Sequence, residues 1–293
     1  MNRGLKRAGY GLAGIIAAAA ILAGGAYAAS EAMIRWPVAR ATGAAAASRD
    51  PGAITRGRRL AVEYACHGCH GGDLQGQMFH EIPGLFRGWA PNLTLAAARQ
   101  TDAQLDAALR HGVAADGRRL WIMPSNAFAH LSDQEAGDLI AYMRSFEPAG
   151  AELPRTEFRH LARIGILLGK LQSEPARIAK ERHLAPIDLG PGLARGRSLS
   201  RACIECHGAD LTGVGIIGAP DLMVAASYTP EEFERLLRQG VGSGGRRLGF
   251  MTRVGPDRLG AWTAEDIQAL HAYLKARAAH LLREAEAGRA PSV

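Results

Sequence analysis

Aromatic residues are scarce in this sequence, and cysteine occurs only four times. Phe, Trp and Tyr together make up 6% of the 293 residues. Because aromatic rings bury large areas, small cores with few of them gain from a large bound group, and the shortage favours a prosthetic group. The hydrophobic share of 47% and the charged share of 22% are ordinary for globular proteins. These shares exclude wholesale disorder, collagen-like repeats and a multi-span membrane protein, and the length predicts about two domains.

Lysine is also rare, because 31 of the 35 basic residues are arginine. The net charge of +7 is spread along the chain, without a run of five or more like charges. No basic patch is interleaved with aromatic residues, which is the pattern that would indicate nucleic-acid binding. We therefore interpret the excess as a solvated cationic surface and expect no nucleic-acid partner.

The N-terminus carries an export signal. Arg3, Lys6 and Arg7 precede the segment 8–30, which contains no charged residue. At about 1.5 Å per residue this segment exceeds the ~30 Å hydrocarbon core of a bilayer, and the preceding positive charge directs the rest of the chain outward. The small-x-small tripeptide at 26–28 fits a signal-peptidase site, whereas apolar character continuing to Trp36 favours a retained anchor. We expect a bacterial inner-membrane protein with periplasmic domains, or a soluble periplasmic protein if the signal is cleaved.

All four cysteines fall in two Cys-x-x-Cys-His motifs. The motifs are formed by Cys66, Cys69 and His70, and by Cys203, Cys206 and His207. Two thiols three positions apart on a helical turn can add to the two vinyl groups of one haem, and the adjacent histidine then becomes an iron ligand. A disulfide does not explain a histidine after both pairs, and each cluster offers zinc only three ligands. The motifs predict two covalently attached haem c groups.

The sixth iron ligand is expected from a loop well after each motif, where a methionine thioether raises the reduction potential. Met123 is the first candidate, because Pro124 limits the backbone on both sides of the peptide it joins. Met78 and His80 lie closer to the first motif and remain competing candidates.

An internal repeat relates the two halves of the chain. A shift of 128 positions places the Gly-Arg-Arg-Leu of 117–120 on that of 245–248 and carries Met123 onto Met251. We therefore predict Met251 as the second sulfur ligand. Because no proline follows Met251, Met223 and an open or histidine-ligated iron remain alternatives. The first half carries about eight extra residues between His70 and its Ala-Pro dipeptide, expected to form a surface loop.

Helix signals recur in the same order in both halves. Capping boxes predict middle helices that open at Thr101 and Thr229 and stop before Gly112 and Gly240. Closing helices are expected after residues 132 and 263. No alternating strand pattern of useful length is present, so each domain is predicted to be all-α.

This order of helix, Cys-x-x-Cys-His motif, proline loop, middle helix, methionine loop and closing helix resembles the class I cytochrome c fold. The resemblance covers roughly residues 51–148 and 190–280, and the arrangement is similar to the haem c subunits that accept electrons from membrane-associated bacterial dehydrogenases. It implies that the carbonyls of Pro91 and Pro220 accept the ring N–H of the iron-binding histidines. It also implies that the first and last helices of each domain cross, with Gly57 and Gly196 permitting close approach.

The predicted organisation has four parts. A signal-anchor helix and spacer (1–50) precede a first cytochrome c domain (51–148), a linker (149–189) and a second cytochrome c domain with a C-terminal tail (190–293). The amphipathic segment 160–171 of the linker is expected to pack across the seam between the domains. A membrane-surface or partner helix is the alternative.

The predicted function is electron transfer. Two irons ligated by histidine and methionine leave no position for a substrate, and no nucleophile–base constellation or phosphate-binding loop is present. We expect a dihaem cytochrome c, not itself an enzyme, that relays single electrons from a dehydrogenase or quinone-linked complex to a soluble cytochrome or oxidase. A dihaem cytochrome c peroxidase with one open haem, or a haem-based redox or gas sensor, is the alternative.

Overall fold

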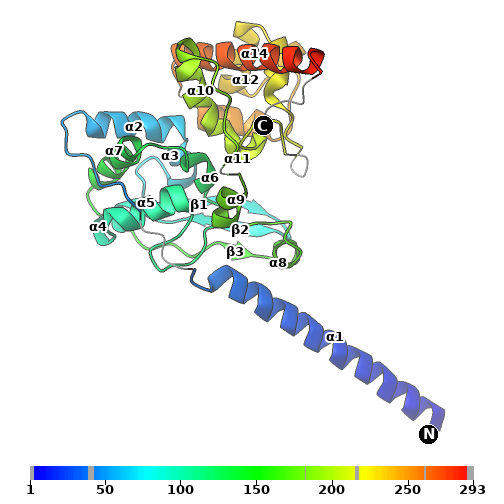
Figure 1. Ribbon diagram of the computed structural model, residues 1–293. Helices are drawn as coiled ribbons and strands as arrows, with labels where there is room; N and C mark the ends of the chain where they lie inside the picture. The colour runs from blue at the N-terminus through cyan, green and yellow to red at the C-terminus, as the bar shows by residue number, and fades with distance from the viewer. Residues whose placement is uncertain (1–2, 39–42, 182, 215–217, 261, 289–293) are drawn as a thin grey trace.

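The computed structural model describes residues 3–38, 43–181, 183–214, 218–260 and 262–288. One long helix, α1 (Arg3–Arg35), projects from two mostly helical units (Figure 1). The first unit and the connector comprise α2 (Ala53–Glu63), α3 (Cys66–His70), β1 (Gln77–Ile82), β2 (Phe86–Ala90), α4 (Leu93–Arg99), α5 (Asp102–His111), α6 (Ser125–Phe128), α7 (Asp133–Arg144), β3 (Glu157–Phe158), α8 (His160–Leu167) and α9 (Glu174–Glu181). The second unit comprises η1 (Pro191–Leu193), α10 (Ala194–Ser200), η2 (Arg201–Cys203), α11 (Ile204–His207), η4 (Leu222–Ser227), α12 (Pro230–Gln239), η5 (Ser243–Gly245), α13 (Met251–Val254), η6 (Gly255–Leu259) and α14 (Ala264–Glu286). The predicted helical class with two repeated units after an apolar N-terminal helix is confirmed.

The middle helices begin and end where the sequence predicts. Thr101 forms a reciprocal capping box with Gln104 at the start of α5, and Thr229 forms one with Glu232 at the start of α12. Both helices stop at a glycine in the left-handed region, Gly112 with φ 66° and Gly240 with φ 68°. Each signal satisfies backbone groups that the helix itself leaves without partners.

The first and last helices of each unit pack directly against one another, as expected from the small residue on each first helix. A Cβ added to Gly57 of α2 would lie 2.0 Å from the carbonyl oxygen of Asp138 in α7. A Cβ added to Gly196 of α10 would lie 2.1 Å from the carbonyl oxygen of Ala269 in α14. Only glycine therefore allows these two backbones to approach so closely.

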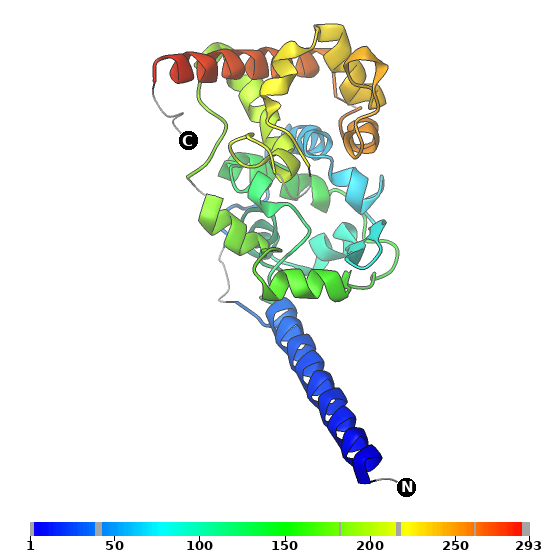
Figure 2. The ribbon, with the colours of Figure 1, turned by 90° about the vertical axis from the view of Figure 1, so that its right-hand side faces the viewer.

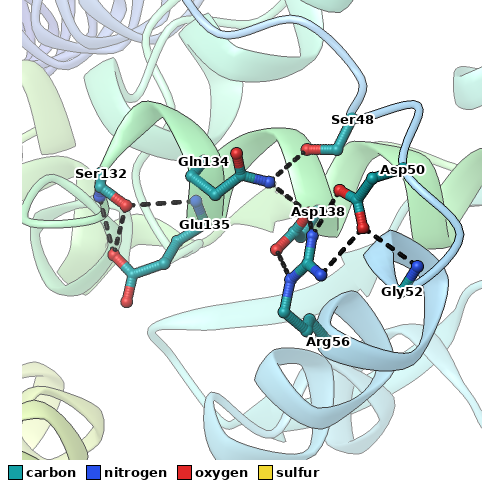
Figure 3. A network of polar contacts seen from close by, with 8 residues as sticks. All are labelled: Ser48, Asp50, Gly52, Arg56, Ser132, Gln134, Glu135 and Asp138. Atoms are coloured by element: carbon teal, nitrogen blue, oxygen red, sulfur yellow. Dashed lines mark hydrogen bonds and ion pairs between the residues drawn. The ribbon is translucent and has the colours of Figure 1, made fainter.

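An arginine holds the first of these crossings in place. The guanidinium of Arg56 lies between Asp50 and Asp138, donating from Nε to Asp138 over 2.7 Å and from Nη2 to Asp50 over 2.6 Å (Figure 3). Gln134 adds bonds of 3.0 Å to Ser48 and 2.9 Å to Asp138. Burial alone would raise the pKa of Asp138, but the hydrogen bonds, chiefly from Arg56, hold it below its usual value.

The extra residues of the first unit form a hairpin rather than an irregular loop. β1 pairs antiparallel with β2, and β2 pairs with β3 from the connector, giving a small three-stranded sheet in the order β1-β2-β3. The strands are short, and their burial does not alternate regularly, so no period-2 pattern marks them in the sequence. This sheet is an addition to the predicted helical plan.

The two units stack on one another. In both views the second unit lies on the far side of the first unit from α1 (Figures 1 and 2). α6 contacts η2 and α11 of the second unit, while α2 and α3 contact η6. The segments that carry the two Cys-x-x-Cys-His motifs thus both lie at the seam between the units.

The connector between the units runs over the first unit. α9 packs on α5 and α6, and α8 packs on the C-terminal part of α1. The expectation that the segment 160–171 packs across the seam is therefore not met by α8. Its partner is the N-terminal helix, whose C-terminal end lies beside it.

Candidate haem-binding sites

Each Cys-x-x-Cys-His motif forms a short helical turn. α3 follows Ala65, which adopts a left-handed φ of 53°, and ends at Gly71 with φ 81°. The second motif spans η2 and α11 and ends at Gly208, also with φ 81°. One turn of helix brings residues three apart to the same face, so each pair of thiols is presented together. All four cysteines are half-buried.

The histidine of each motif is oriented by a proline carbonyl. Nδ1 of His70 lies 2.9 Å from the carbonyl oxygen of Pro91, and Nδ1 of His207 lies 2.8 Å from that of Pro220. A carbonyl only accepts, so Nδ1–H donates and the lone pair of each ring is on Nε2. Burial, the largest cause, lowers the pKa of both imidazoles despite these hydrogen bonds. Both rings are therefore neutral near pH 7 and suited to metal ligation through Nε2.

Each predicted methionine packs against the core of its own unit. Met123 is half-buried and packs, as Cys66 and Leu93 do, against the core of the first unit. Met251 is half-buried at the start of α13 and packs, as Cys203 does, against the core of the second unit. The repeat thus places one thioether on the core of each unit.

The loop before Met251 is closed without the proline that follows Met123. The backbone N–H of Leu248 donates to the hydroxyl of Thr252 over 2.7 Å, and the N–H of Met251 donates to the carbonyl of Leu248 over 3.1 Å. In the first unit the residue after Pro124, Ser125, donates its hydroxyl to the carbonyl of Ala108 over 2.8 Å. In the second loop, the hydrogen bond to the Thr252 side chain therefore restrains the backbone at the position where the first loop has a proline.

The second motif lines a cavity whose walls come from both units. The lining residues are Glu63, Tyr64, Ala65, Ala202, Cys203, Cys206, His207, Met251, Val254 and Leu259. Two thiols, an imidazole and a thioether thus share one largely apolar cavity. This donor set fits a haem bonded through the thiols and ligated on both sides of its iron.

The competing ligand candidates Met78 and His80 stay close to the first motif, because their strand β1 contacts α3. Met78 lies on β1 with 45% of its surface exposed. His80, on the same strand, has its ring centroid 6.3 Å from that of Phe86 and 6.2 Å from that of Phe250. Met223 lies in η4, where its backbone N–H caps onto Asp221, and it does not line the cavity beside His207.

A four-residue ionic network at the seam was not predicted from the sequence. Arg59 and Glu63 come from α2, Arg195 comes from α10 and Asp266 from α14. Nη2 of Arg195 lies 2.8 Å from Asp266, Nη2 of Arg59 lies 3.1 Å from the same carboxylate, and both arginines also bind Glu63. Glu63 and Asp266 are both buried. Only the Arg59–Glu63 pair has a helical i,i+4 spacing; the pairs that join the two units have no sequence spacing to mark them. The network holds α2 at the edge of the cavity.

Among residues 3–38, 43–181, 183–214, 218–260 and 262–288, no group of three or more His, Cys, Asp and Glu side chains is arranged to hold a metal ion by itself. In the second unit a single histidine and a single methionine, His207 and Met251, line one cavity, which is the arrangement that the haem interpretation requires.

Comparison with known proteins agrees with the repeated plan. The family model for cytochrome c matches residues 54–147 and again residues 193–278. The chain is 28% identical over 259 residues to the fructose dehydrogenase cytochrome subunit of Gluconobacter japonicus, an alignment that covers 76% of this chain and 52% of that protein. The chain therefore spans about half the length of that curated relative.

Proposed function

Because this chain belongs to the cytochrome c family, we propose that it is a dihaem cytochrome that relays single electrons on the periplasmic side of a bacterial inner membrane. Cytochrome c domains bind haem covalently and transfer electrons, and the printed name of the relative describes a cytochrome subunit of a dehydrogenase. That name supports a dehydrogenase as the donor, and a quinone-linked complex is the other donor that we propose. We propose a soluble cytochrome or an oxidase as the acceptor.

In this proposal each unit holds one haem with its own residues. Cys66 and Cys69 attach the first haem, and Cys203 and Cys206 attach the second. A bound haem supplies a reversible one-electron change of its iron, and the protein tunes the potential through ligands and burial.

The iron ligands complete each site. His70 and His207 would bind the iron through Nε2, while the carbonyls of Pro91 and Pro220 hold their rings in orientation. Met123 and Met251 would be the sixth ligands, and their thioethers would favour the reduced iron.

The observation that carries the proposal is the cavity shared by the two units. Tyr64 and Ala65 of the first unit line it together with His207 and Met251 of the second. Ala65 directly precedes Cys66, to which the first haem would be attached. One peptide bond therefore separates the wall of the second site from the attachment point of the first, which supports direct electron transfer within the chain.

The order of the units supports a direction of transfer. The first unit lies next to α1, and the second lies farther from it (Figures 1 and 2). Among the described residues, one helical segment, Tyr10–Arg35, is long and apolar enough to cross a membrane. With α1 retained as the anchor, the first site lies nearer to membrane-bound donors and the second nearer to soluble acceptors.

Carbon monoxide titration of the reduced protein tests the proposal. Two irons that each carry histidine and methionine should bind no carbon monoxide. Met251→Ala should open one of the two, and Met223→Ala, the matched control at the competing methionine, should leave both closed. Carbon monoxide binding by the unaltered protein would instead favour the peroxidase or sensor alternative.

A further inference from the structure

α8 is apolar on two opposite faces, and only one of them is covered. Ala162 and Ile166 are 2% and 1% exposed. Leu161, Ile164 and Leu168 follow the helical spacing on the other side and are 50%, 52% and 68% exposed. A row of large aliphatic side chains on the surface of a globular unit is uncommon and indicates an interaction surface.

This exposed row lies beside the candidate membrane span. Figure 2 shows α8, the bright green helix, lying across the C-terminal end of α1. Arg163 of α8 donates to Ser30 over 3.0 Å, pairs with Glu31 at 2.6 Å and lies 4.1 Å from the ring centroid of Tyr27. Ser30 is fully buried. These contacts fix α8 to one level of α1.

That level corresponds to the edge of the bilayer. About 20 residues of helix cross the ~30 Å hydrocarbon core, so a span that starts at Tyr10 leaves the core near Ala29. Arg163 contacts the helix at residues 27, 30 and 31, which is the depth where the hydrocarbon meets the headgroups. Trp36, 69% exposed, lies just beyond, where tryptophan is favoured at membrane interfaces.

We propose that α8 is a second membrane contact, whose exposed face of Leu161 and Ile164, extended by Leu168 directly after the helix, rests in the headgroup boundary of the bilayer that α1 spans. The occupant is the lipid surface because α8 packs against the anchor that crosses this bilayer. Arg35, Arg159 and Lys170 are exposed near the ends of α1 and α8 and suit anionic phospholipid headgroups.

Two contacts have a consequence that one cannot provide. A single helix would leave the two units free to rotate and tilt about the point where α1 leaves the membrane. With α8 also in contact with the membrane surface, both motions are restricted. The first haem site would then be held at a fixed height and orientation above the membrane. The inference rests on the proposed role of α1 as an anchor.

Thiol labelling of the full-length holoprotein in nanodiscs of phosphatidylcholine and phosphatidylglycerol tests the inference. Leu168→Cys supplies a reporter directly after α8, and Leu282→Cys, on α14 in the second unit and 54% exposed, is the matched control. The thiolate is the reactive species, and an apolar surrounding suppresses its formation. We therefore expect a charged methanethiosulfonate to label position 168 at least about tenfold more slowly than position 282. Equal rates at the two positions would overturn the proposal.

Photocrosslinking separates a lipid from a protein partner. With a benzophenone amino acid replacing Leu168, we expect adducts of phospholipid mass, and none with the same residue replacing Leu282. Adducts to protein alone would refute lipid as the occupant. Carbonate extraction of native membranes tests the anchor separately, because release of the protein would contradict the role of α1 whatever the labelling shows.

Discussion

Replacing Gly196 by alanine should destabilise the second unit severely, because the new methyl group has nowhere to go. Its Cβ would lie 2.1 Å from the carbonyl oxygen of Ala269 and 2.6 Å from Cβ of Tyr273. The nearest of these atoms is backbone, so relief requires α10 and α14 to separate. Overpacking typically costs about 1–3 kcal/mol, and the higher helix propensity of alanine returns at most ~1 kcal/mol. Since α10 and α14 must move as whole helices, we take the upper end of this cost and expect a net loss of about 2 kcal/mol, out of the roughly 5–15 kcal/mol that stabilises a domain.

Urea unfolding of the holoprotein, followed by far-ultraviolet circular dichroism and haem absorbance, measures this loss. With a slope of about 2 kcal/mol per molar, the midpoint of the second unit should fall by roughly 1 M. Gly192→Ala is the matched control, because a Cβ there meets no atom within 4 Å, and surface changes of this kind stay within about 0.5 kcal/mol. Equal midpoints for the two variants would refute the close crossing of α10 and α14.

Three further predictions concern the iron sites and one buried acid. Met123→Ala should open the first iron, lower its potential and remove part of the near-infrared sulfur-to-iron band; an unchanged band would contradict the ligand assignment. Cys203→Ala should abolish stable attachment of the second haem, so that denaturing gels stained for haem show about half the signal per chain. Burial raises the pKa of Glu174 to about 7 from 4.5, so its stabilising contribution is complete below pH 4.5 and is lost as the pH rises to 7. The free energy of unfolding should therefore fall by about 3 kcal/mol over this pH range. Glu174→Gln should remove this fall from the pH dependence of urea unfolding, and an unaltered pH profile would show that Glu174 is not the group responsible.

Local signals predicted much of each unit from the sequence. The capping boxes at Thr101 and Thr229 act within one helical turn, so spacing alone identifies them, and both are present. Pro91 and Pro220 lie within hydrogen-bond distance of the histidines to which the resemblance assigns them. The repeat carried Met123 onto Met251, which lines the cavity beside His207. The roles of these residues as iron ligands stay predictions.

Features that depend on contacts between distant segments were not predicted from the sequence. β2 pairs with β3, which lies far along the chain in the connector, and β3 has only two residues, too few to show a period. Arg195 meets Glu63 only because the two units stack as they do. The partner of α8 was misjudged for the same reason, since an amphipathic pattern specifies that a face is covered and not which element covers it.

The central claim is that two haems are bonded to this polypeptide through its four cysteines. The intact mass of the full-length protein, matured in a host that attaches haem c, tests it most directly. We expect the mass of the polypeptide plus two haems, falling by one haem in Cys203→Ala. A mass equal to the bare polypeptide would contradict the account.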